Sequence, residues 1–154
     1  NNLPLRGKKG DVYEGGTRVP TIVSWPEHVE PGRADSPTQI TDWMPTFCSL
    51  AGVEADSNLK WDGTDLTQLL VNQTQLPTRP IYTAGPRWRA SSLHYGDWKL
   101  VVSGEGQNRK VELFNIAADI GEAKNLADAE PKRTIQMLER LQQAAKRDRD
   151  AVAK

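Results

Sequence analysis

The residues best placed by type and spacing to do chemistry lie within residues 4–20, PLRGKKGDVYEGGTRVP. Two adjacent lysines, Lys8 and Lys9, stand between Gly7 and Gly10. Because glycine has no side chain and tolerates positive φ, a bound anion can approach this backbone closely. An ammonium group there is a compact donor suited to a phosphate or sulfate oxygen. The spacing therefore indicates an anion-binding loop, although most loop lysines simply face solvent.

This segment resembles the lysine loop of the type I sulfatases, the arylsulfatase family. The resemblance continues in the family's order along nearly the whole chain, which makes it far more specific than a lone Glu-Gly-Gly. The matching stretches are VPTIVSWP at 19–26, TDWMPTFCSLAG at 41–52, DGTDLTQLL at 62–70, GDWKLV at 96–101, ELFN at 112–115, DIGE at 119–122 and Asn125-Leu126.

The resemblance implies that Lys9 is the catalytic lysine, which contacts the sulfate of the substrate. Lys8 is then the more solvent-facing neighbour and a lesser substrate contact, and a register shift of one residue would exchange the two. Glu14 and Arg18 are spaced to brace the turn, because a carboxylate–guanidinium pair fixes geometry through bidentate bonds. We expect Gly15 and Gly16, between them, to be required by backbone conformation.

Arg89 and His94 are two further candidates for substrate binding. They lie in RWRASSLHYGDWKL, a region that can approach the mouth of the active site in related enzymes. The alternative reading is structural: Trp88 and Trp98 lie in the core of a sheet, and His94 is a partly exposed histidine at a strand end. We favour the structural reading for the two tryptophans.

The family's nucleophile is a cysteine or serine in a C/S-x-P/A-x-R motif, which is converted to formylglycine. Cys48, the only cysteine, is followed by Ser-Leu-Ala-Gly and occupies an apolar helical position, so it is not that nucleophile. In the family the metal ligands and catalytic histidines precede the lysine loop. We therefore expect a C-terminal part of a sulfatase with no metal ligands of its own, inactive alone. The resemblance assigns calcium, or another divalent metal, to the full-length parent.

The implied parent is a sulfuric ester hydrolase acting on a small sulfate ester or a sulfated glycan. The expected partner of this chain is the N-terminal catalytic portion of the same protein, in a periplasmic, secreted or lysosomal setting. A phosphonate or phosphodiester hydrolase of the same superfamily is one alternative, and a non-catalytic binding or docking module is another. The upstream nucleophile motif would separate the two hydrolases, and weak anion binding without turnover would fit the module.

The composition of the 154 residues is that of an ordinary soluble domain, with 37% hydrophobic and 26% charged residues. Twenty basic residues balance twenty acidic ones, so no overall field attracts nucleic acid or an anionic membrane. Any affinity for anions must therefore arise from local placement, as at the two lysines.

The predicted fold is α/β: the C-terminal part of an alkaline-phosphatase-like sulfatase fold. Residues 1–75 form the edge of the catalytic domain, and residues 76–154 form a small antiparallel sheet with a packed C-terminal helix. The sequence patterns predict a buried strand at 19–25, helices starting at Thr41 or Asp42 and at Thr64 or Asp65, strands at 81–84, 88–93, 98–102 and 111–114, and a helix that opens at Pro131. The strand at 19–25 is the expected weak point, with an edge available for self-association.

Overall fold

The computed structural model describes residues 2–54 and 60–148, which form two compact units. The first unit contains residues 1–20 and 78–147, and the second is built on residues 21–77. The boundary at 77–78 falls in the polar stretch that separates the two predicted regions. The first twenty residues group with the sheet, whereas the sequence division placed them with residues 21–75. Their assignment to a catalytic domain of the parent stays a prediction.

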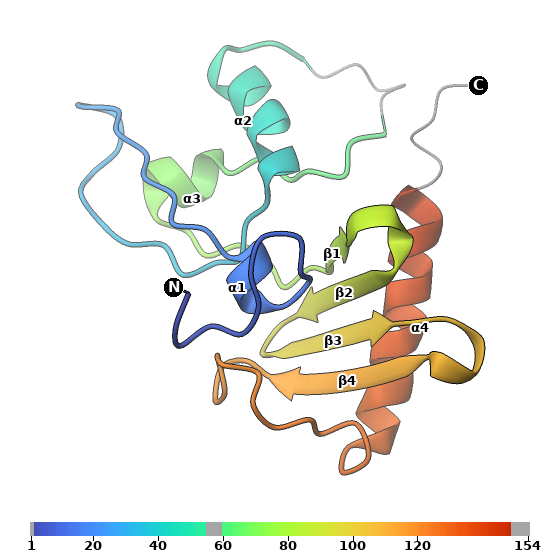
Figure 1. Cartoon of the computed structure of the whole chain (residues 1–154). Coiled ribbons are helices and arrows are strands. Elements are labelled where there is room, and N and C mark those ends of the chain that lie inside the picture. Colours follow the sequence, from blue (N-terminus) through green and yellow to red (C-terminus); the bar gives the residue numbers. More distant parts are fainter. Residues whose placement is uncertain (1, 55–59, 149–154) are drawn as a thin grey trace. The chain divides into compact units, whose positions relative to one another are not determined.

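The first unit is built on a four-stranded antiparallel sheet in the order β1-β2-β3-β4 (Figure 1). The sheet and the C-terminal helix confirm the predicted arrangement. The strands are β1 (Ile81–Ala84), β2 (Ala90–Tyr95), β3 (Trp98–Ser103) and β4 (Lys110–Asn115), and the helix is α4 (Pro131–Asp148).

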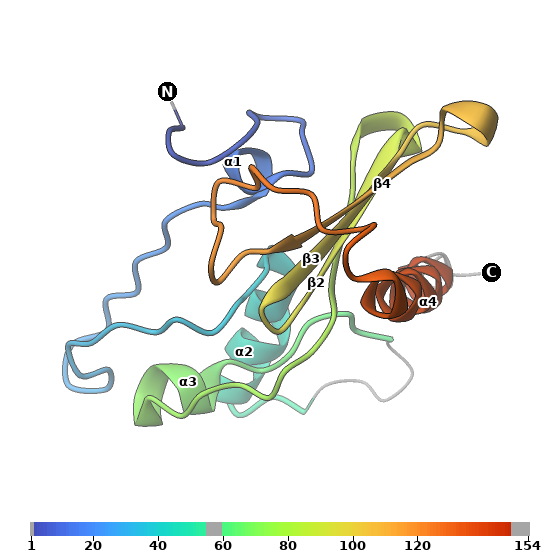
Figure 2. The same cartoon turned by 90° about the horizontal axis from the view of Figure 1, so that it is seen from below.

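One face of the sheet packs against α4 (Figure 2). Leu93, Leu100 and Leu113 pair across the three longest strands and are fully buried there with Met137 and Leu141. Helical spacing in the sequence predicts that one stripe of this helix contains Ile135, Leu138, Leu141, Ala145 and Val152. This prediction is partly wrong, since Ile135 is 57% exposed. Ile135 lies two residues before Met137, about 200° around the helix axis, and so on the opposite side. Val152, predicted for the same stripe, lies outside the described residues.

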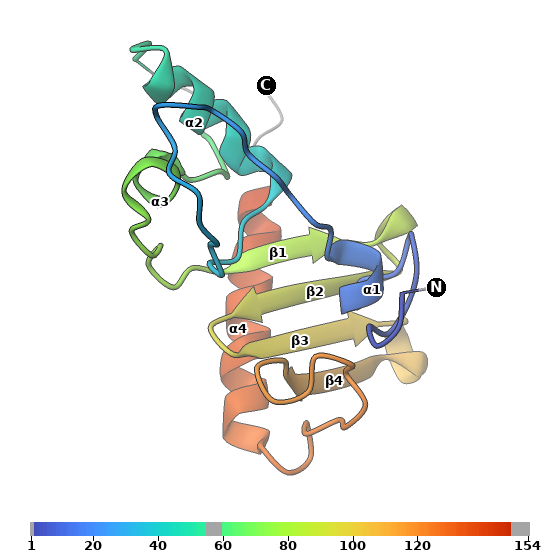
Figure 3. The same cartoon turned by 90° about the vertical axis from the view of Figure 1, so that its left-hand side faces the viewer.

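The opposite face of the sheet is covered by the N-terminal segment and by the chain that follows β4 (Figures 2 and 3). The sequence pattern predicts loop throughout residues 1–18, but residues 14–17 form the short helix α1 (Glu14–Thr17), which lies over this face. Val12, Val101, Phe114 and Ile116 form its apolar cluster. Burial on both faces explains why β3 reads as a nearly continuous apolar run instead of an alternating one.

The second unit contains the 3-10 turn η1 (Ile40–Asp42), α2 (Trp43–Leu50) and α3 (Thr67–Asn72). Helical spacing in the sequence predicts that the apolar residues of α2 are Trp43, Met44, Phe47, Leu50 and Ala51, but Met44 and Phe47 are exposed. The buried residues of η1 and α2 are instead the polar Asp42 and Thr46. Asp42 accepts hydrogen bonds from the N–H groups of Gln39 and Thr64, and the Thr46 hydroxyl accepts from Leu66 N–H. Thr46 therefore fixes the helix to the chain that precedes α3.

The predicted buried strand at residues 19–25 is wrong. These residues form no strand, and Ile22 is 92% exposed. A strand requires backbone partners, and none of the described segments pairs with this one. Pro20 and Pro26 also remove two donors from the region. The proposed self-association consequently loses the strand edge on which it depended, while exposed apolar side chains such as Ile22 remain.

Amide hydrogen exchange should separate the sheet from this extended segment. The amides of residues 98–102 lie in β3, which is hydrogen-bonded on both sides, so they should exchange only through large opening events. Residues 21–25 should exchange without comparable protection. Equal protection of the two segments in a monomer would contradict this arrangement.

Candidate functional site

Residues 7–11, here called the lysine turn, form a tight turn that presents both lysines to solvent. Asp11 N–H donates to the carbonyl of Lys8 at 2.8 Å, and the Asp11 carboxylate accepts from Lys8 N–H at 2.9 Å. Gly7 and Gly10 have φ of 87° and 95°, which side chains rarely allow. Lys8 and Lys9 are exposed, and neither ammonium forms an ion pair within the described residues. The turn therefore offers two cations that no described carboxylate neutralises.

Helix α1 rests directly on the backbone of this turn. Gly15 N–H donates to the carbonyl of Arg6 at 2.7 Å. A Cβ added at Gly15 would lie 2.5 Å from the carbonyl oxygen of Gly7, and one at Gly16 would lie 2.1 Å from that of Asp11. Positive φ is not the reason, because neither glycine has it. Close approach of two backbones, and not the special conformation that we expected from the sequence, requires these glycines.

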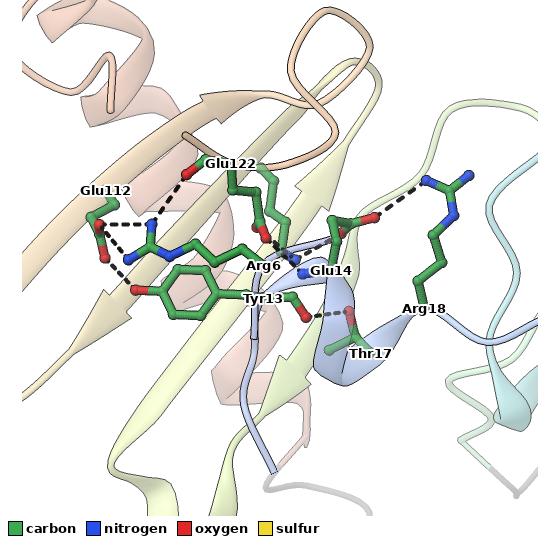
Figure 4. Close-up of polar contacts among 8 residues, drawn as sticks. Arg6, Tyr13, Glu14, Thr17, Arg18, Glu112 and Glu122 are labelled. Carbon is green, nitrogen blue, oxygen red and sulfur yellow. Dashed lines mark hydrogen bonds and ion pairs between the residues drawn. The ribbon is translucent and has the colours of Figure 1, made fainter. Parts of the chain in front are cut away.

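A buried ion cluster ties α1 to the sheet (Figure 4). Lys99 Nζ, in β3, lies 2.7 Å from Glu14 Oε1 and 3.0 Å from Glu122 Oε1, with the lysine side chain only 2% exposed. Glu14 N–H also donates to Glu122 Oε2 at 2.7 Å. Burial raises the pKa of Glu122, against the opposing effects of that N–H and the Lys99 charge. One ammonium thus holds two carboxylates from segments far apart in the sequence.

A second cluster holds the start of the lysine turn (Figure 4). The Arg6 guanidinium lies 3.3 Å from Glu112 Oε1 and 3.9 Å from the centre of the Tyr13 ring. The Tyr13 hydroxyl donates to Glu112 Oε2 at 2.5 Å. Burial, then the hydrogen bond to Glu112 and its charge, raise the pKa of Tyr13 to about 12. Burial acts to raise the pKa of Glu112, but donors including Tyr13 and the nearby cations lower it.

The predicted Glu14–Arg18 contact is present at 3.4 Å, but it joins one guanidinium nitrogen to one oxygen, and the Arg18 side chain is 56% exposed. The principal partner of Glu14 is therefore Lys99. The bracing role of Arg18 remains a prediction.

Arg89 and His94 lie at opposite ends of β2. Arg89 follows the turn that contains Pro86, and a Cβ at Gly10 would lie 3.8 Å from that proline, so this turn is beside the lysine turn. His94 is five residues further along, about 17 Å in an extended strand. Its Nε2 lies 2.7 Å from the carbonyl of Gly96 and therefore carries the proton, since a carbonyl can only accept. Burial lowers the pKa of His94, so the neutral ring is favoured.

Sequence reasoning missed Lys99, Glu112, Glu122 and Tyr13 as groups that position the turn. The available signal was a lysine inside the apolar run WKLVV and a glutamate inside VELF, two opposite charges in strands expected to be buried. Charged residues are almost never fully buried unless they are paired.

Other features of the described residues place no further chemistry at the turn. Across 2–54 and 60–148, no group of three or more His, Cys, Asp or Glu residues is arranged to hold a metal ion. Nor is any helix in these ranges both long and apolar enough to cross a membrane. A hollow of about 820 Å³ in the second unit is lined by residues that include Trp25, Trp43 and Leu69, and it contains none of the predicted site residues.

Comparison with known proteins places the chain among sulfatases. Residues 8–148 match the family described as N-sulphoglucosamine sulphohydrolase, C-terminal. The chain is 30% identical over 148 residues to a sulfatase of Formosa agariphila, covering 85% of this chain and 26% of the relative. It is 27% identical over 146 residues to arylsulfatase K of Xenopus laevis, covering 86% and 27%. The chain thus spans about a quarter of the length of these curated relatives.

Solved structures confirm the fold. The crystal structure of Ps i-CgsB superposes with a TM-score of 0.81 at 30% identity, over 93% of this chain and 32% of that one. A protein of glycosaminoglycan metabolism in Bacteroides thetaiotaomicron superposes with a TM-score of 0.80 at 22% identity, over 90% and 31%, which shows the shared fold alone.

Replacement of Gly16 by alanine should destabilise the first unit. The new Cβ would lie 2.1 Å from a backbone oxygen, so α1 and the lysine turn must separate, and we expect a loss of about 3 kcal/mol in the free energy of unfolding. Gly106→Ala is the control, because Gly106 has φ of 55° but a Cβ added there would lie within 4 Å of no described atom beyond its chain neighbours, and it should lose only about 1 kcal/mol. Urea unfolding measures both, and equal losses would contradict the proposed contact.

The raised pKa of Tyr13 makes stability depend on alkaline pH. Above its ordinary pKa of 10.0 the unfolded chain releases the phenolic proton, whereas the folded chain retains it until about pH 12. Because the folded state then binds more protons, the stabilisation is complete below pH 10 and is lost as pH rises towards 12. The free energy of unfolding of Tyr13→Phe, measured in urea, should therefore fall less steeply between pH 10 and pH 12 than that of the wild type. Parallel declines would contradict the assignment.

Proposed function

The chain belongs to the N-sulphoglucosamine sulphohydrolase C-terminal family of the sulfatases, and we propose that the protein hydrolyses sulfate esters with the lysine turn at its active site. The observation that carries this proposal is that Lys8 and Lys9 have no ion-pair partner among the described residues, on a turn that two ion clusters fix to the sheet. A purely structural loop has no need of such support for exposed lysines.

Cleavage of a sulfate ester builds negative charge on the sulfuryl oxygens and on the departing ester oxygen. A cation already fixed within hydrogen-bond distance stabilises that charge without reorganising during the reaction. In the proposal Lys9 donates to a sulfuryl oxygen, and Lys8 contributes to the local positive potential. The proposal assigns the divalent metal, calcium, and the formylglycine nucleophile to another part of the full-length protein.

We propose a sulfated carbohydrate as the substrate class. Ps i-CgsB, 30% identical to this chain, has been crystallised in complex with k-i-k-neocarrahexaose, an oligosaccharide. Arg89 supports the proposal, because its turn lies beside the lysine turn and it forms no ion pair with another described residue. His94, at the far end of β2, is the weaker candidate for a contact with the same sugar.

Substitution of Lys9 tests the proposed role. In the full-length sulfatase, Lys9→Ala should lower kcat for a sulfate ester by about 10²–10³-fold, the effect of removing one preorganised donor. Lys8→Ala should have a much smaller effect, and Lys132→Ala, on the exposed side of α4, should have none. Steady-state kinetics on the three purified variants measure these effects. Unchanged turnover in Lys9→Ala would refute the proposal, and a larger effect at Lys8 would shift the assignment by one residue.

A further inference from the structure

We propose that Lys99 is a positioning residue for Lys9: its buried ammonium sets where the lysine turn presents its cation to the substrate. The inference rests on the proposed function of the turn. It gives Lys99 and Glu122, which no sequence feature assigned to the site, a role in the reaction through contacts within this chain.

The environment of Lys99 indicates a purpose other than stability. The side chain is 2% exposed, and its two carboxylate partners, Glu14 and Glu122, are buried as well. Removing three charges from water is costly, and apolar residues of the same volume often serve stability equally well or better. Apolar burial is already provided by Leu93, Leu100 and Leu113 on the opposite face of the same sheet. What the ions add is a defined direction and distance for the segment that they hold.

The position of Lys99 is transmitted to Lys9 through contacts that leave little room for adjustment. Lys99 holds Glu14, the first residue of α1. The next two residues of α1 are glycines that lie against the carbonyl oxygens of the turn, so that an added Cβ at Gly16 would be 2.6 Å from the Lys8 oxygen. No side chain intervenes between helix and turn. Any shift of α1 on the sheet must therefore move the backbone on both sides of Lys9.

The second cluster does not duplicate this function. Arg6 and Tyr13 hold the residues before the turn and before α1 through Glu112. These contacts retain the segment on the sheet, whereas the carboxylate of Glu14 and the N–H of the same residue both meet the Lys99–Glu122 pair. Loss of the Lys99 cluster should therefore leave the turn attached but less accurately placed. A misplacement of about 1 Å can slow an enzyme by about 10²-fold.

The test is a pair of substitutions that leaves no charge unbalanced. Lys99→Met with Glu122→Gln removes one positive and one negative charge, keeps a similar side-chain volume, retains an amide oxygen for Glu14 N–H, and leaves Glu14 with Arg18. In the full-length sulfatase we expect kcat for a sulfate ester to fall by about 10–100-fold with KM changed less than about threefold. Lys132→Met is the control, at an exposed lysine of α4 that belongs to neither cluster, and should change kcat less than about twofold.

A double-mutant cycle with Lys9→Ala distinguishes positioning from general structural support. If Lys99 acts through Lys9, the Lys99→Met/Glu122→Gln pair should have little further effect in the Lys9→Ala background. The inference would be overturned if the reductions in kcat caused by Lys9→Ala and by the Lys99→Met/Glu122→Gln pair multiplied when combined. It would also be overturned if the paired variant were as active as the wild type. If Lys9→Ala itself leaves turnover unchanged, the proposed function fails first and this inference fails with it.

Glu14→Gln keeps the inference testable should the paired variant not fold. It leaves Lys99 and Glu122 as a balanced pair and weakens their link to α1, together with the contact between Glu14 and the largely exposed Arg18. The same fall in kcat, again absent in the Lys9→Ala background, is expected. Wild-type kcat in a folded Glu14→Gln protein would overturn the inference.

Discussion

A lysine ammonium buried inside a sheet must be neutralised where it lies, and this requirement organises the first unit. Lys99 draws one carboxylate from the N-terminal segment and another from the chain after β4, and so joins three distant parts of the sequence. Once formed, such a cluster is difficult to break piecewise, because losing one partner leaves a buried charge at a cost of about 3–5 kcal/mol. Each fully buried leucine on the opposite face contributes about 1.5–3 kcal/mol by the hydrophobic effect. The ion cluster therefore defines where the N-terminal segment lies on one face, while the opposite face contributes apolar burial against α4.

The two units use the same device at different places. In the second unit, buried Asp42 and Thr46 hold α2 to the chain before α3, and an added Cβ at Gly63 would lie 2.0 Å from the Thr41 carbonyl oxygen. In both cases a polar side chain satisfies backbone groups that would otherwise be buried without partners, while a glycine lets two backbones meet. Sequence motifs rich in Asp, Thr and Gly here mark close backbone contacts, and their residues need not take part in chemistry.

The sequence predicts some levels of this structure well and others poorly. The meander of β1–β4 and the helix from Pro131 follow from local periodicity and turn residues, which act over short distances. The strand at 19–25 fails because a strand is defined by its partners, and β-branched residues cannot show whether a partner is present. The lysine turn is recognisable from its glycines and cations. The residues that support the turn cannot be recognised in the same way. Lys99, Glu112 and Glu122 are separated from the N-terminal segment by some 80 to 120 positions in the sequence, and an isolated charge in a strand does not identify its counter-ion.

The discontinuity of the first unit affects the order in which the protein can assemble. Residues 1–20 leave the ribosome before any of the strands that hold them, and residues 21–77 must be made in between. The hairpins of the sheet form from neighbouring segments, whereas docking of the N-terminal segment closes a long loop and so costs conformational entropy. The lysine turn consequently acquires its shape only after Glu122 has been synthesised. Premature termination anywhere before β4 would yield a chain that carries Lys9 but has no surface on which to place it.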